Sequence, residues 1–172
     1  MKNIYITWDG PYTLEDLNDD EILKNEAEAY GVYQIYGHHP VYGADVLLYI
    51  GKAEQQTFAK RIKQENWEYN GDSENIKIYI GKLFDKTQPK GLEWDRLITL
   101  AEKLLIFTHS PAMNSSNINS LTKSDKIRKE IEEVRVINYD NFRSLMTEVS
   151  GDIYIQSLDW FDESKIFTAE NI

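Results

Sequence analysis

The pattern of apolar and polar positions predicts three strands within the first half of the chain. Residues 31–37 alternate small or polar side chains with Val, Tyr, Ile and Tyr between two glycines, and residues 76–84 begin with a similar alternation. Residues 46–51 form a continuous apolar run, as in a buried strand. The turn or loop predicted at 38–43 is short, so the first two strands are expected to form an antiparallel hairpin.

The clearest helix is predicted at residues 92–107, where apolar side chains recur at three- and four-residue intervals up to Ser110-Pro111, which ends it. Residues 13–29 are expected to form one or two short acidic helices, with Thr13 and Asp16 spaced as in a capping box. The pattern also predicts helices at 56–66 and 124–133 and strands at 134–139 and 152–156, the last two around a Ser150-Gly151 turn. No element is predicted for the tail from Leu158 onward.

The order of these elements is strand, strand, helix, strand, helix, with additions at both ends. This order suggests an α+β layer in which helices cover a small sheet. The length of 172 residues suits one domain with a substantial core and appended pieces. An apolar content of 41% and an aromatic content of 12% are sufficient to form that core.

Composition excludes several classes of protein. No apolar run approaches the roughly 18 residues of a membrane helix, and the N-terminus lacks the apolar region of a signal peptide. The chain has no cysteine, which excludes disulfide scaffolds, cysteine-type zinc fingers and cysteine nucleophiles. A soluble, cytoplasmic protein is therefore expected.

The formal charge of −10 argues at first against a nucleic-acid partner, but the charge is unevenly distributed. Residues 1–30 hold two Lys against eight Asp or Glu, which gives −6, and residues 119–172 hold seven basic against eleven acidic residues, which gives −4. Residues 31–118 hold ten of each sign and are neutral. This middle region can present a local basic patch, for which modest and salt-sensitive DNA affinity is expected.

Residues 31–118 also carry a set of motifs in a characteristic order. They are Gly31-Val32-Tyr33, Tyr49-Ile50-Gly51-Lys52-Ala53, Arg61 in the following helix, Glu102 in a later apolar helix, Ser110-Pro111, and Asn114 twelve residues after that Glu. Each motif is weak alone, because tyrosine is common in strands. Together, over about 88 residues, they resemble the GIY-YIG nuclease superfamily.

The resemblance implies a three-stranded antiparallel sheet flanked by helices, with a site for one divalent metal on one face. The nuclease domain would span residues 31–118. Residues 1–30 would form an acidic, helical N-terminal extension, and residues 119–172 a C-terminal extension packed on the same domain.

The resemblance also implies the roles of the site residues in a metal-dependent DNA endonuclease. Tyr33 and Tyr49 would project into the site from adjacent strands, and Tyr33 would help to take a proton from the attacking water. A free tyrosine has a pKa near 10, so a cation must stabilise its phenolate at neutral pH. Lys52 and Arg61 are expected to supply that field, and the guanidinium fork of Arg61 suits phosphate oxygens.

The second half of the motif set implies the metal site. Glu102 would bind Mg²⁺ or Mn²⁺ together with water and substrate oxygens. Asn114 would orient a neighbouring group or a water through its amide. Hydrolysis would leave 5′-phosphate and 3′-hydroxyl ends.

One position departs from the family pattern. Glu65 stands one helical turn after Arg61, where many members have His or Tyr. Five alternatives are open: Glu65 binds a second metal, acts as the base, points away from the site, or marks a weakened enzyme, or the helix lies one residue off and Gln64 takes this position. His109 lies near the motif set in sequence and is a further candidate.

Other readings of the same sequence stay open. The fold is also compatible with a binding or regulatory module without catalysis, which would take a protein or nucleic-acid partner, and RNA is an alternative target. Cutting both strands of DNA usually demands two active sites, so a homodimer is expected of a nuclease. A second Tyr-Ile-Gly, at residues 79–81, lies in the third predicted strand without a following arginine helix, and a structural role is predicted for it.

Overall fold

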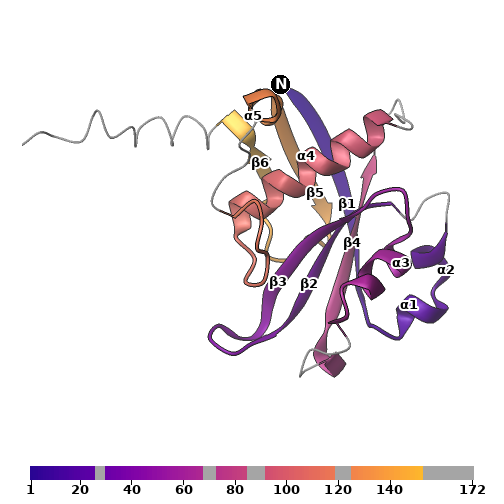
Figure 1. The fold of residues 1–172 in the computed structure, drawn as a ribbon. Helices are drawn as coiled ribbons and strands as arrows, with labels where there is room; N and C mark the ends of the chain where they lie inside the picture. The colour runs from indigo at the N-terminus through magenta and orange to yellow at the C-terminus, as the bar shows by residue number, and fades with distance from the viewer. Residues whose placement is uncertain (26–29, 68–72, 85–91, 119–124, 153–172) are drawn as a thin grey trace, which may run out of the picture.

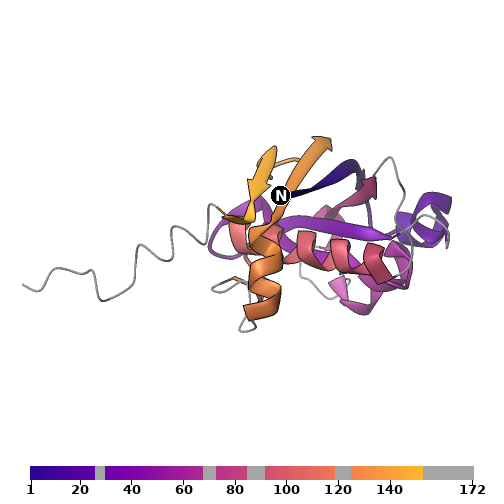
Figure 2. The same ribbon diagram turned by 90° about the horizontal axis from the view of Figure 1, so that it is seen from above.

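The computed structural model describes residues 1–25, 30–67, 73–84, 92–118 and 125–152, and these form an α+β fold (Figure 1). A mixed, six-stranded sheet curls into a half-barrel, as the view from above shows (Figure 2). The strands, in the order in which they lie side by side, are β3 (Gly43–Ala53), β2 (Gly31–His39), β4 (Lys77–Phe84), β1 (Lys2–Tyr12), β5 (Val134–Asp140) and β6 (Glu148–Ser150). The helices are α1 (Asp16–Asp19), α2 (Glu21–Lys24), α3 (Phe58–Gln64), α4 (Leu92–His109) and α5 (Asp125–Glu132).

The three strands predicted in the first half of the chain are confirmed as β2, β3 and β4, and β2 pairs antiparallel with both of the others. The prediction of a small three-stranded sheet is wrong. The sheet continues through β1, which pairs antiparallel with β4 and parallel with β5, and β6 pairs antiparallel with β5. The extra strands form because both termini supply apolar, period-two segments to a sheet whose third strand would otherwise have an open edge.

Strand β1 is the element that the sequence analysis missed. Ile4, Ile6 and Trp8 are buried and alternate with half-buried Tyr5 and Thr7, so the period-two signal was present in the sequence. Helical structure in the N-terminal segment is confined, among the described residues, to α1 and α2. The prediction of a helical extension over residues 1–30 is therefore wrong for residues 2–12, while its domain boundaries remain a prediction.

The remaining element predictions compare well where the structure describes them. The helices predicted at 13–29, 56–66, 92–107 and 124–133 are confirmed as α1 with α2, α3, α4 and α5, and the strand at 134–139 as β5. The expected pairing of Thr13 with Asp16 is present, since the Asp16 carboxylate accepts from the Thr13 backbone N–H at 2.6 Å. The strand beside β5 comes earlier than expected, at 148–150, and residues 153–172 lie outside the described residues.

Two apolar clusters lie on opposite faces of the sheet. Helix α4 crosses one face diagonally and buries Leu97, Ile98, Leu104 and Leu105 against residues that include Ile6 and Trp8 (Figure 1). Helices α1, α2 and α3 cover the other face at its β2–β3 end, around Tyr33, Ile35, Phe58 and Ile62. Both β3 faces are therefore supported by a helix, α3 on one side and α4 on the other. No helix among the described residues is long and apolar enough to cross a membrane.

A buried asparagine links β1, β5 and the segment before β6. The Trp8 indole N–H of β1 donates to Asn138 Oδ1 of β5 at 2.8 Å, and Asn138 Nδ2 donates to the Met146 carbonyl at 2.7 Å. Trp8 and Asn138 are each only 1% exposed. Loss of the amide would leave the buried Trp8 N–H without its acceptor, which is costly because a buried donor loses the full free energy of its hydrogen bond.

We expect Asn138→Ala to lower the free energy of unfolding by about 2–4 kcal/mol, because it removes two buried hydrogen bonds. Urea denaturation followed by tryptophan fluorescence measures this change. Asn141→Ala is the matched control, because exposed Asn141 makes one side-chain hydrogen bond, to the Gly10 carbonyl at 2.7 Å, and its loss should cost less than about 1 kcal/mol. Equal losses for the two variants would contradict the role assigned to Asn138.

Candidate active site

Gly31 and Gly51 lie in the two signature strands, where neighbouring atoms come too close to leave room for a Cβ atom. Tyr33 of β2 lies opposite Gly51 of β3, and a Cβ atom at Gly51 would lie 2.5 Å from Tyr33 Oη and 2.7 Å from Tyr49 Cε1. Glycine at this position lets the Tyr33 and Tyr49 rings lie side by side, with centroids 6.1 Å apart. Gly31 has a φ of +154°, and a Cβ there would lie 2.1 Å from the carbonyl oxygen of Gly81 in β4.

The second Tyr-Ile-Gly lies in β4, and its contacts agree with the structural role predicted for it. Gly81 faces the core, and a Cβ on it would lie 2.8 Å from Ile6 Cγ2 and from Trp8 Cζ3. Tyr79 packs edge-on against Tyr36, with ring centroids 5.5 Å apart. These contacts account for the tripeptide by packing alone.

Asn114 holds the edge of β3. Its amide accepts from the Ile50 N–H and donates to the Ile50 carbonyl, both at 2.9 Å, and the side chain is buried. The backbone N–H groups of Ala112 and Met113 donate to the carbonyls of Leu47 and Leu48. The segment after α4 thus acts as a partial strand beside β3, and the Asn114 amide is occupied by the backbone rather than free to orient a water.

Helix α3 brings Arg61 and Glu65 to the same face as the two tyrosines. The helix begins at Thr57, whose hydroxyl accepts from the Lys60 N–H at 3.3 Å. The Arg61 guanidinium forms a close ion pair with the Glu65 carboxylate, in which the side chains are 30% and 24% exposed. Glu65 therefore faces Arg61, which argues against the alternative in which it points away from the site.

A polar pocket of about 290 Å³ connects α3 to α4 past the end of β3. It is lined by Lys52, Glu54, Gln55, Gln56, Arg61 and Glu102. Lys52 Nζ forms a close ion pair with Glu54 and donates to Thr99 Oγ1 at 2.7 Å. Three of the residues expected from the sequence, Lys52, Arg61 and Glu102, thus come together from three separate elements.

The environment of Glu102 favours its neutral form in the absence of a metal. Burial raises the pKa of the Glu102 carboxyl to about 7, in spite of the opposing influence of Lys52, Lys103 and Arg61. Glu54 is close enough to raise the pKa further. A divalent cation would reverse this preference, because it stabilises the carboxylate.

Both tyrosines resist ionisation. Burial is the main cause that raises the pKa of Tyr33, followed by Tyr49 and Glu65, and burial followed by Glu65 raises the pKa of Tyr49. Tyr33 is fully buried, and its Oη atom has no hydrogen-bond partner among the described residues. Trp67, which packs edge-on against Tyr49 at 5.7 Å, likewise has an unpaired, buried indole N–H within the described part of the chain.

The described carboxylates fit a sparsely held metal better than a closed metal site. No group of three or more His, Asp or Glu side chains in the described ranges could hold a metal ion together. Glu102 is a half-buried carboxylate of the pocket, and the charge of Glu54 is close enough to influence it. This donor set suits Mg²⁺ or Mn²⁺, which take one or two carboxylates and complete the shell with water and substrate oxygens.

His109 lies at the end of α4 and does not line this pocket. Its Nε2 accepts from the Met146 N–H at 2.9 Å, so Nδ1 carries the proton that is donated to the Leu105 carbonyl, also at 2.9 Å. Burial lowers the pKa of this imidazole. His109 therefore ties α4 to the segment before β6, in its neutral form.

The sequence analysis missed Glu54, Thr99 and Trp67. Glu54 follows Lys52 at a spacing that places the two side chains on the same side of an extended strand, which is a readable signal. Thr99 and Trp67 reach the site only through the packing of α4 and of the turn after α3, for which no sequence spacing is diagnostic.

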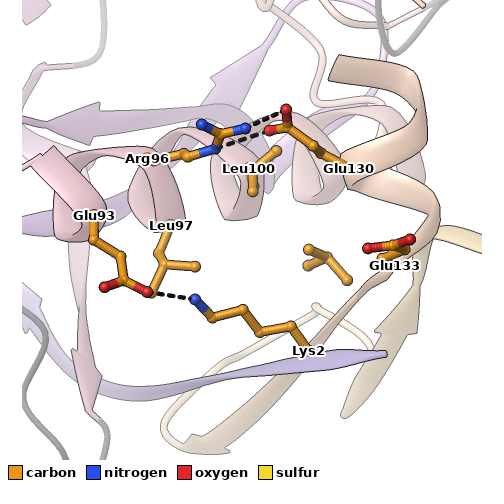
Figure 3. A pocket seen from close by; sticks show the side chains of 8 residues that line it. Lys2, Glu93, Arg96, Leu97, Leu100, Glu130 and Glu133 are labelled. Carbon is orange, nitrogen blue, oxygen red and sulfur yellow. Dashed lines mark hydrogen bonds and ion pairs between the residues drawn. The ribbon is translucent and has the colours of Figure 1, made fainter. Parts of the chain in front are cut away.

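A larger pocket, of about 430 Å³, lies between α4, α5 and β1 (Figure 3). Its rim consists of two ion pairs, Lys2 with Glu93 at 2.8 Å and Arg96 with Glu130, while Leu97 and other aliphatic side chains line its interior. It contains none of the residues expected from the sequence. The smaller pocket is the candidate active site because the titratable and cationic groups converge there.

The raised pKa of Glu102 predicts a pH-dependent stability difference from Glu102→Gln. The unfolded carboxyl ionises above about pH 4.5 but the folded one only near pH 7, so wild-type stability falls as the pH rises between these values. In EDTA, the Gln variant should be more stable than wild type at pH 8.5 by up to about 3 kcal/mol, with the gap closing towards pH 4.5. Urea denaturation at both pH values measures it. Glu93→Gln, on the exposed side of the same helix, should show no such trend.

No protein-family model matches this chain, and no curated protein or solved structure matches it either. The assignment of a function therefore depends on the site itself. The residues that resemble the GIY-YIG signature lie close together in space, and the function proposed below follows from their chemistry.

Proposed function

We propose that this protein is a metal-dependent endonuclease of the GIY-YIG type, which hydrolyses DNA phosphodiester bonds. The observation that carries the proposal is the convergence of Lys52, Arg61 and Glu102 on one pocket beside the paired rings of Tyr33 and Tyr49. These residues come from four elements, β2, β3, α3 and α4. The order of β2, β3, α3, β4 and α4 along the chain also agrees with the family pattern.

Arg61 and Lys52 would bind the scissile phosphate. The guanidinium of Arg61 faces both the pocket and the tyrosines, and its planar donors match two phosphate oxygens at once. Lys52 is anchored by Thr99 and Glu54, so its ammonium group has a fixed position in the pocket. Fixed positive groups of this kind stabilise the charge that develops on phosphoryl oxygens during transfer.

Glu102 would hold the metal, Mg²⁺ or Mn²⁺. When bound, the metal would polarise a phosphoryl oxygen and stabilise the leaving 3′ oxygen. Partial burial at the wall of the pocket raises the pKa of Glu102. A carboxylate that is costly to ionise in the empty pocket has a strong preference for a cation, which favours a metal ligand over a solvated helix residue.

The proton of the attacking water would pass towards the tyrosine pair. Tyr33, the base implied by the resemblance, is fully buried, whereas Tyr49 retains some exposed surface. The pKa of each phenol is raised, so neither accepts a proton at neutral pH without a nearby cation. Arg61 opposes the shift in both tyrosines and is the group best placed to lower these pKa values.

A second candidate function is a catalytically weak or inactive module that binds a protein or nucleic acid. It is favoured by a specific observation: both cations of the pocket are already ion-paired, Lys52 with Glu54 and Arg61 with Glu65.

For the nuclease function, DNA is the proposed partner and RNA is the alternative substrate. A homodimer would place two such sites on one duplex.

We expect the wild-type protein to nick or linearise supercoiled plasmid in Mg²⁺ or Mn²⁺, and Glu102→Gln to lose at least about a hundredfold in rate. The Gln side chain keeps the volume of Glu102 but cannot provide the charge that holds the metal. Gel electrophoresis over time measures both rates. Glu93→Gln, on the same helix outside the pocket, should cut like wild type.

Other outcomes separate the alternatives. Equal cutting by wild type and Glu102→Gln would show that the activity is a contaminant or that the site is wrongly placed. If the wild type cuts no plasmid, single-stranded DNA, branched DNA or RNA, the binding-module function becomes the better account.

A further inference from the structure

The ion pair between Arg61 and Glu65 differs from an ordinary pair on a helix surface. Its side chains are 30% and 24% exposed, so both are largely shielded from solvent. Arg128 and Glu132 of α5 have the same four-residue spacing, but they are 43% and 36% exposed and their atoms are 3.4 Å apart. The α5 pair is a solvated pair of the kind that contributes little to stability. The α3 pair lies instead at the mouth of the candidate active site.

Glu65 also reaches the tyrosines. After burial, the negative charge of Glu65 has the largest influence on the pKa of Tyr49, which it raises, while the nearby Arg61 lowers it. The Glu65 carboxylate therefore lies beside the Arg61 guanidinium and close to the Tyr49 side chain. Both of these donors would face a phosphate in the proposed nuclease.

The position of the carboxylate is fixed by the end of the helix. The Glu65 N–H donates to the Ile62 carbonyl at 3.1 Å, so the residue closes the last turn of α3. Among the described residues, the Arg61 side chain has one further hydrogen bond, from Nη1 to Gln64 Oε1 at 3.4 Å, which is a long contact. Glu65 is thus the principal partner of Arg61 among the described residues.

We propose that the Glu65 carboxylate occupies the phosphate-binding position of Arg61 in the resting protein and must be displaced when a phosphodiester binds. This inference rests on the proposed function, because it takes Arg61 as the phosphate ligand. A carboxylate and a phosphodiester carry the same charge and both accept from a guanidinium fork, so they compete for one position. Glu65 lowers the affinity for the phosphate backbone and restricts tight binding to substrates that supply enough other contacts.

Competition for Arg61 also accounts for a Glu at position 65, where many family members have His or Tyr. In this role Glu65 takes no part in the cleavage step itself. A base or a second metal ligand needs a carboxylate whose lone pairs face the water or the metal. The Glu65 carboxylate is instead paired with the Arg61 guanidinium. The ion pair would open when the substrate binds, and Arg61 would exchange one anionic partner for another.

The test compares DNA binding by wild type, Glu65→Gln, Arg61→Gln/Glu65→Gln and the control Glu132→Gln. Fluorescence anisotropy with a labelled, mixed-sequence duplex in EDTA at low salt measures the dissociation constants without cleavage. We expect Glu65→Gln to bind about fivefold more tightly than wild type, because the phosphate no longer competes with a carboxylate for Arg61. This gain in DNA affinity should be absent from the double variant, because that variant lacks the Arg61 guanidinium. Glu132→Gln removes the same charge from a solvated pair of equal spacing and should leave binding unchanged.

Three results would overturn the proposal. In the first, Glu65→Gln binds DNA no more tightly than Glu132→Gln, so that any change in affinity comes only from the loss of one negative charge. In the second, the gain persists without Arg61, which places the effect elsewhere. In the third, Glu65→Gln binds like wild type but cuts at least about a hundredfold more slowly, which makes Glu65 a base. Circular dichroism and melting temperature verify that each variant is folded.

The plasmid assay separates this inference from the proposed function. If wild type cuts DNA and Glu65→Gln shows no Arg61-dependent gain in binding, the inference about Glu65 fails alone. If wild type cuts no nucleic acid but the gain is present, the competition at Arg61 stands and the catalytic function fails.

Discussion

Strand β3 lies at the edge of the sheet, and the candidate site depends on how that edge is held. On one side β2 provides the antiparallel ladder, and on the other the Asn114 amide bonds both backbone groups of Ile50. An edge strand otherwise presents unpaired backbone groups to solvent and is free to shift. Tyr49 precedes Ile50 and Lys52 follows it by two residues, so the hydrogen bonds that hold Ile50 also fix the backbone that carries these two side chains. Asn114 therefore positions the site without contributing a free polar group to it.

The site combines cations and anions in nearly equal number, and this balance governs its chemistry. Lys52 and Arg61 are each neutralised by a carboxylate from their own segment, Glu54 and Glu65. The remaining carboxylate, Glu102, is half-buried and has a pKa raised to about 7. A site arranged in this way has little net attraction for a phosphate until a divalent cation enters or an internal ion pair opens. The same balance agrees with a chain whose middle region is neutral and whose flanks are acidic.

The second half of the sheet gives the site a rigid base. Strand β1 pairs along both edges, with β4 and with β5, and carries Trp8 into the core beneath α4. The hydrogen bond from Trp8 to Asn138 connects two segments that are 130 residues apart in sequence. Because α4 packs on Ile6 and Trp8, the position of Glu102 depends on a strand that contains no site residue. Residues 2–12 and 134–150 are therefore part of the framework rather than separate additions.

The sequence by itself determined the local elements and the identity of the candidate site residues. Period-two patterns located β2 and β4, and period-3.6 patterns located α3 and α4, because a half-buried strand or helix must alternate its apolar positions in that way. A continuous apolar run located β3. The signature residues Tyr33, Tyr49, Arg61 and Glu102 were also readable, since their order along the chain is distinctive. The sequence did not reveal that β1 would join the middle of the sheet, because strand pairing between distant segments leaves no local signal.

Only the tertiary structure decided how these residues face one another. The burial of Tyr33, the raised pKa of Glu102, the capture of Asn114 by the Ile50 backbone and the direction of Glu65 all result from packing. Desolvation and the distances between charges depend on three-dimensional neighbours, which residue spacing does not specify. For the same reason His109, a site candidate by its place in the sequence, is committed through both ring nitrogens to backbone groups outside the pocket.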